Sequence, residues 1–161
     1  MLVAVGIGSF FLTVMAVFYM FSLNSFGAMA NYADFGRQNR LTSDMLSKDI
    51  RSALYVVSAV PNQIVLAAPD GSNISYTYSP SLRTVTRVNG SNSRVVLKNV
   101  AWMAFALYGR PDPFANYNVF PTATAANAKV VGFQWSCSEI VAGPESNTED
   151  IQTAIVSMRN K

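Results

Sequence analysis

Acidic side chains are few in this chain, and those that could bind a metal gather near its end. They lie in or beside one stretch that is rich in turn residues: Glu139, Glu145, Glu149 and Asp150. Carboxylate oxygens bind Ca²⁺ when they alternate along a loop. The run ESNTED lacks that alternation, so we expect a solvated loop here and no metal site.

Nucleophilic catalysis has little support in the composition. The chain has no histidine, so neither a Ser-His nor a Cys-His pair can form. The single Cys137 cannot close a disulfide within the chain. We therefore expect a protein that is not an enzyme and that carries no cofactor.

Four basic residues flank a predicted turn at Asn89-Gly90: Arg83, Arg87, Arg94 and Lys98. No acidic residue lies between Asp70 and Asp112, and on paired strands the four could share one face. Such a face could hold DNA phosphates or another anionic surface. However, alternating basic and apolar residues are typical of any half-exposed strand, and a net charge of +3 is mild for a nucleic-acid-binding protein. We adopt the solvated face and expect no nucleic acid partner.

The first part of the chain lacks charge altogether. Hydrophobic residues make up 50% of the sequence and charged residues 13%, and no charged side chain precedes Asp34. A bilayer core of about 30 Å needs about 20 such residues as a helix. A secretory signal has a basic start and an apolar core of about 7–15 residues. Here no basic residue precedes the run and the run is longer, so we expect a membrane anchor.

The helix is expected to continue beyond the apolar run. No proline occurs between Asn24 and Val60. Apolar residues recur there at helical spacing and predict a stripe that packs on a sheet: Leu46, Ile50, Leu54 and Val57. Pro61 lacks an N–H and disfavours helix at the preceding residue. The sequence therefore predicts one helix from near the N-terminus to about Val60.

After Pro61 the pattern changes to that of strands. Residues 63–79 predict a hairpin that turns at Asp70-Gly71, and residues 82–100 predict one around Asn89-Gly90. Three more runs are strand-like, AWMAFALY, VVGFQWSCS and TAIVSMRN, and two turn-rich loops separate them at 110–127 and 139–150. The predicted fold is α+β, with an antiparallel sheet on the amphipathic half of a long helix.

Three runs are similar to parts of one protein family. LVAVGIGSFFLTVMAVF resembles the apolar half-helix that follows a prepilin cleavage site, RLTSDMLSKDIRSA the amphipathic half-helix, and AIVSMRN the last strand. The chain thus resembles type IV pilins and pseudopilins, in particular W-type minor pilins and J-type pseudopilins of type II secretion. The Phe-Thr-Leu-x-Glu run of these families would align just before Met1.

The resemblance implies a function as well as a fold. Residues 1–35 would anchor the chain in the inner membrane and later form the core of a surface filament, and residues 36–161 would form a globular head. The implied partners are copies of the chain, the membrane and the pilus or secretion assembly machinery. The apolar side chains that would pack between copies are Leu2, Val3, Val5, Ile7, Phe10, Phe11, Leu12, Val14, Val17, Phe18 and Phe21.

Two other functions stay open at this point. A minor pseudopilin would prime or cap a pilus or secretion filament without forming its shaft. A membrane-anchored binding module would hold a ligand on its sheet and form no filament.

Overall fold

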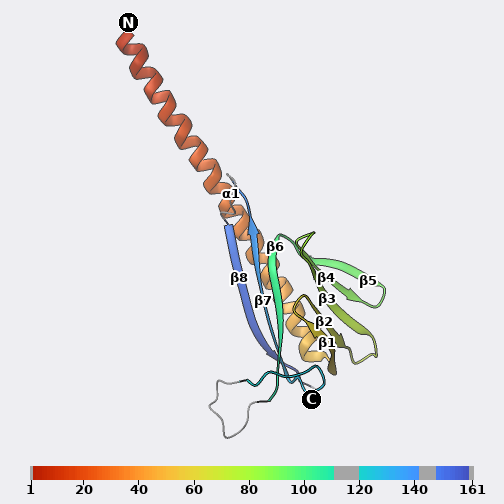
Figure 1. Ribbon diagram of the computed structural model, residues 1–161. Helices are drawn as coiled ribbons and strands as arrows, with labels where there is room; N and C mark the ends of the chain where they lie inside the picture. The colour runs from red at the N-terminus through yellow and green to blue at the C-terminus, as the bar shows by residue number, and fades with distance from the viewer. Residues whose placement is uncertain (1, 111–119, 142–147, 160–161) are drawn as a thin grey trace.

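The chain forms one long helix that carries two antiparallel sheets. The computed structural model describes residues 2–110, 120–141 and 148–159. Helix α1 (Leu2–Ser52) projects from the head over its first half and lies against the sheets over its second half (Figure 1). We call residues 3–33 of α1 the stalk. The α+β fold predicted from the sequence is therefore confirmed.

The first sheet contains five strands in sequence order, each antiparallel to the next. They are β1 (Tyr55–Val60), β2 (Gln63–Ala67), β3 (Asn73–Ser79), β4 (Thr84–Asn89) and β5 (Asn92–Leu97). Both predicted hairpins occur here, as β2–β3 and β4–β5. Gly71 and Gly90 lie in their turns with φ of 82° and 57°, a left-handed conformation that glycine adopts at little cost.

A second sheet holds the remaining strands, whereas the sequence predicted a single sheet. Its order is β6 (Val100–Tyr108), β7 (Val130–Glu139) and β8 (Thr148–Ser157). Strand β8 begins inside the stretch predicted as a loop, because residues 148–150 complete the ladder with the end of β7. That part of the loop prediction is wrong.

The helix ends at Ser52, well before the predicted end near Val60. Residues 55–60 read YVVSAV and form β1 instead, since aromatic and β-branched side chains favour strands. Pro61 lies in the tight turn where Val60 pairs with Gln63. The prediction that Leu54 and Val57 pack a helix on the sheet is therefore wrong: they are 40% and 43% exposed.

The core lies between the second half of α1 and the two sheets. Leu46 and Ile50 on α1 are fully buried there. Tyr76 comes from the first sheet, and Phe133 and Trp135 come from the second, where their rings stack at 5.3 Å. The helix is thus shared by both sheets, and its buried residues run from Phe35 to Ile50.

Candidate functional site

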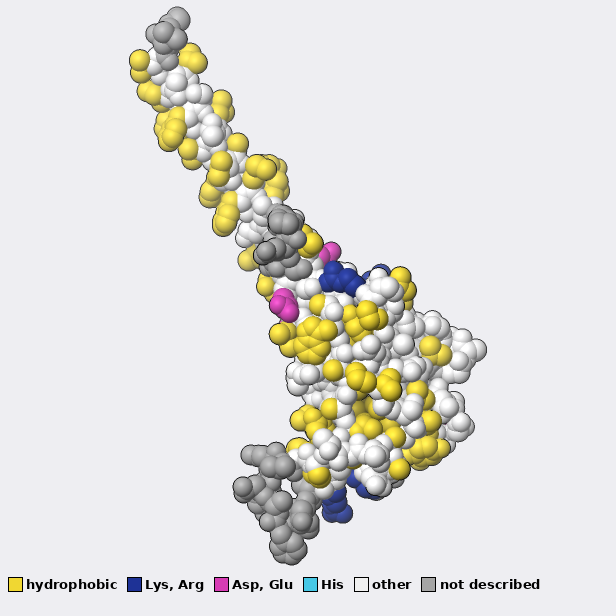
Figure 2. All heavy atoms as spheres, viewed as in Figure 1, with side chains coloured by type: hydrophobic (Ala, Val, Ile, Leu, Met, Phe, Trp, Pro, Cys, Tyr) yellow, Lys and Arg dark blue, Asp and Glu magenta, His cyan; other side chains and the backbone are white. Residues whose placement is uncertain are grey.

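The stalk leaves its apolar side chains uncovered. Every predicted packing residue from Val3 to Phe21 is between 49% and 76% exposed, whereas the side chain of Leu2 lies outside the described residues. Figure 2 shows apolar side chains along the visible length of the stalk. The helix is long and apolar enough to cross a membrane.

Such exposure is unfavourable in water. Leaving a large apolar side chain exposed costs about 1.5–3 kcal/mol relative to burying it, and soluble monomers rarely expose contiguous apolar patches beyond a few hundred Å². The stalk is therefore built for an apolar environment, which lipid or other helices can supply. This property is compatible with membrane anchoring.

Asn39 fixes α1 to the second sheet. Its side chain is 2% exposed. Its Oδ1 accepts a hydrogen bond from Trp135 Nε1 at 2.7 Å and one from Cys137 Sγ at 3.5 Å, and its Nδ2 donates to Asp150 Oδ2 at 2.6 Å. One amide thus joins α1, β7 and β8. An unsatisfied buried polar group costs about 1–3 kcal/mol, so these bonds fix which face of the helix meets the sheet.

Asp49 fixes α1 to the first sheet. Its Oδ2 accepts from Arg87 Nε at 2.8 Å and from Tyr76 Oη at 2.6 Å. Burial and the bond to Asp49 raise the pKa of the Tyr76 hydroxyl, and the bond to Asp49 raises the pKa of Arg87. Nearer the stalk, Thr42 Oγ1 donates to the carbonyl of Val96 on β5 at 2.9 Å. The stalk therefore leaves the head in a defined direction.

Of the four basic residues predicted as a possible anionic-ligand face, Arg87 and Arg94 are cross-strand partners and share one face of the first sheet, but the four have different partners. The Arg83 guanidinium donates to the carbonyl of Ser138 on β7, and to its Oγ at 2.8 Å. Arg87 is paired with Asp49. Arg94 and Lys98 are exposed and line a groove with Arg37 of α1. The sequence analysis missed Arg37, because strand alternation gives no information about which helix turn lies beside β5.

The described acidic residues considered for a metal site accept hydrogen bonds within the head. Glu139 accepts a hydrogen bond from Asn99, and Glu149 Oε1 accepts one from Ser136 Oγ at 2.7 Å. Glu145 lies outside the described residues. In the described ranges, no group of three His, Cys, Asp or Glu side chains is placed to hold a metal ion.

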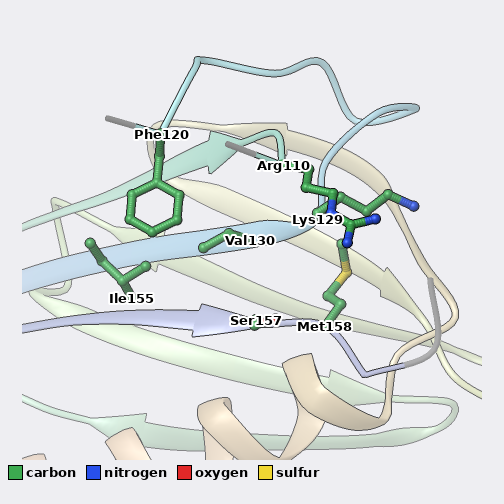
Figure 3. Close-up of a pocket in the computed structure, with 7 residues that line it drawn as sticks. All are labelled: Arg110, Phe120, Lys129, Val130, Ile155, Ser157 and Met158. Atoms are coloured by element: carbon green, nitrogen blue, oxygen red, sulfur yellow. The ribbon is translucent and has the colours of Figure 1, made fainter. Parts of the chain in front are cut away.

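A cavity of about 580 Å³ lies at the end of the head farthest from the stalk. In Figure 3 the charged ends of Arg110 and Lys129 lie side by side, and Phe120 faces Ile155. The sequence analysis missed this cavity because its walls come from β7, β8 and the β6–β7 connection. Residues 111–119, between Arg110 and Phe120, lie outside the described residues.

The connection between β7 and β8 reaches the stalk. A Cβ added at Gly27 would lie 2.9 Å from Val141 Cγ1. Glycine therefore permits this contact, because any side chain there would displace Val141. The head thus extends along α1 beyond its core residues.

Comparison with protein-family models, with curated proteins and with solved structures finds no match to this chain. The stalk and its attachment to the head are therefore the features from which a function can be argued.

Proposed function

We propose that the chain is a structural subunit of a type IV pilus-like filament and that it polymerises through the stalk. It is anchored in the inner membrane before assembly and lies in a cell-surface filament afterwards. The observation that carries this proposal is the uncovered apolar half of α1, which projects from the head as a continuous helix. A bilayer and a bundle of helices both remove this surface from water, so one segment serves both environments.

The width of the head restricts how stalks can bundle. The head is much broader than the stalk (Figure 2), and helices pack with their axes about 8–10 Å apart. Stalks can approach to that distance only if the heads lie outside the bundle and are staggered along it. The aromatic side chains of the stalk, among them Phe10, Phe11 and Phe18, supply large areas for such packing.

Cross-linking between stalks tests the proposal. Native Cys137 is buried and has a raised pKa, so a thiol reagent acts chiefly on an introduced cysteine. Staggered stalks do not place equal positions at disulfide distance, so a long flexible bis-maleimide is used, and in cells that assemble the filament it should link Val14→Cys copies into dimers. Ser81→Cys, at an exposed turn of the head, is the matched control. The absence of Val14→Cys dimers would contradict polymerisation, and equal dimers from both variants would indicate random collision.

The same comparison separates the alternatives. A minor pseudopilin that caps a filament would be cross-linked to other subunits and not to its own copies. An anchored binding module would remain monomeric in the membrane, and the cavity beside Arg110 and Lys129 is the place in the head where it would hold a ligand.

A further inference from the structure

A basic groove lies where the stalk enters the head. It has a volume of about 420 Å³ and is formed by α1 and the β5 region. Its lining contains three cations, Arg37, Arg94 and Lys98, and no acidic side chain, and it includes the apolar Leu41 and Val95. Lysine and arginine side chains gather at this level of the molecule in Figure 2.

Two of the three cations are uncompensated. Arg37 pairs with Asp34 at 3.1 Å. Arg94 and Lys98 make no ion pair within the described part of the chain. Arg94 lies directly across the β4–β5 ladder from Arg87, whose charge is matched by Asp49. The groove therefore carries positive charge that the head itself does not neutralise.

The groove also has an apolar component. Leu41 and Val95 are 59% and 43% exposed, although they lie beside the cations. Single exposed apolar side chains are common on solvated surfaces, but next to uncompensated cations they also suit a surface that lies at a membrane interface.

The length of the stalk sets the height of the groove above a membrane. At about 1.5 Å per residue, residues 3–33 rise about 46 Å. A bilayer with its headgroup layers is about 40–45 Å thick. When the stalk spans the bilayer, the first charged turn of α1, which carries Asp34 and Arg37, reaches the outer headgroup layer. The groove then opens beside the lipid phosphates.

We propose that this groove binds the anionic headgroups of the membrane in which the stalk is anchored. A guanidinium donates two parallel hydrogen bonds to a phosphate, a role that fits Arg94, and an ammonium attracts it as a point charge, a role that fits Lys98. The inference depends on the membrane-anchored stage of the proposed function. Headgroup binding would give the membrane-anchored subunit a preferred height and orientation on the bilayer before assembly.

Lipid binding by the full chain in neutral detergent micelles tests the inference, with native mass spectrometry as the readout. Phosphatidylglycerol should bind more tightly than phosphatidylcholine. Each basic residue near an anionic membrane contributes about a five-fold gain in affinity, so Arg94→Gln with Lys98→Gln should weaken phosphatidylglycerol binding about 25-fold. The matched control is Lys48→Gln with Arg51→Gln, two exposed cations farther along α1; it should leave binding unchanged.

Three results would overturn the inference. The groove variant could bind phosphatidylglycerol as the wild type does, the control could weaken binding equally, or a short duplex DNA could bind the wild type better than the lipid does. Alkaline carbonate extraction of the wild type from membranes distinguishes a failure of headgroup binding from a failure of the proposed membrane anchor. A chain that carbonate releases contradicts the anchor itself, whereas a chain that stays inserted with no lipid preference contradicts only the groove.

Discussion

Asn39 and Trp135 lie 96 residues apart in the sequence, and the indole Nε1 of Trp135 donates to Asn39 Oδ1 at 2.7 Å inside the core. The bond joins the helix that carries the stalk to the central strand of the second sheet. It fixes the rotation of α1 about its axis, and through it the direction in which each apolar side chain of the stalk projects.

Replacement of Asn39 should destabilise the head. Asn39→Ala leaves Trp135 Nε1 and Asp150 Oδ2 without this partner, and we expect the free energy of unfolding to fall by about 2–3 kcal/mol. Urea unfolding of the full chain in detergent, followed by tryptophan fluorescence, measures this change. Asn127→Ala, at an exposed position, is the control. Equal midpoints for the two variants would contradict the structural role of Asn39.

Asp49→Asn should weaken the attachment of the first sheet to the helix and lower the stability of the head. It leaves Arg87 without its charge partner, and breaking a buried ion pair costs about 3–5 kcal/mol. Because Arg87 keeps some exposure, solvent screening reduces the cost, and we expect a loss of about 2 kcal/mol, below that range. Asp44→Asn lies on the exposed side of the same helix and should change stability by less than about 0.5 kcal/mol. The urea midpoints of the two variants should therefore differ, and coincident midpoints would refute this assignment.

Stability should fall as the pH rises above about 9. Burial raises the pKa of the Cys137 thiol from 9.0 to about 12, so above pH 9 the unfolded chain loses this proton while the folded chain keeps it. The slope approaches about 1.4 kcal/mol per pH unit as the unfolded thiol becomes fully ionised, and it is about half of that at pH 9. Urea midpoints between pH 9 and 10 measure the slope, and Cys137→Ala should reduce it. An unchanged slope in Cys137→Ala would show that other groups cause the loss.

A charge in the stalk should oppose both membrane insertion and packing between stalks. Phe18 lies in the middle of the apolar run and is 71% exposed. Phe18→Lys places an ammonium near the centre of a bilayer, at a cost of about 2.5–3.5 kcal/mol. We expect a larger carbonate-extractable fraction and no filaments, whereas Phe18→Leu should behave as the wild type. Normal filaments from Phe18→Lys would contradict the packing role of the stalk.

The sequence predicted most elements of this fold because their signals are local. The apolar run, the Asp70-Gly71 and Asn89-Gly90 turns, and the alternation along β3 and β7 each depend on a few neighbouring residues. The end of α1 differs from the prediction because Pro61 is a strong local stop signal, whereas the YVVSAV run before it prefers a strand that pairs with β2.

The arrangement of the cations could not be predicted from the sequence. Whether Arg87 is neutralised depends on Asp49, a residue on another element, and whether Arg94 meets Arg37 depends on where β5 crosses α1. Both relationships are set by packing between distant segments. The division of the head into two sheets has the same origin, because strand patterns do not specify which strands become neighbours.

Cryo-electron microscopy of filaments sheared from cells that produce this chain tests the central claim most directly. The account predicts that this chain repeats along the filament, that residues 3–33 form the core as a helix bundle, and that the two-sheet heads lie outside. Recovery of the chain only from the membrane fraction, or only at filament tips, would contradict the claim that it is the repeating subunit.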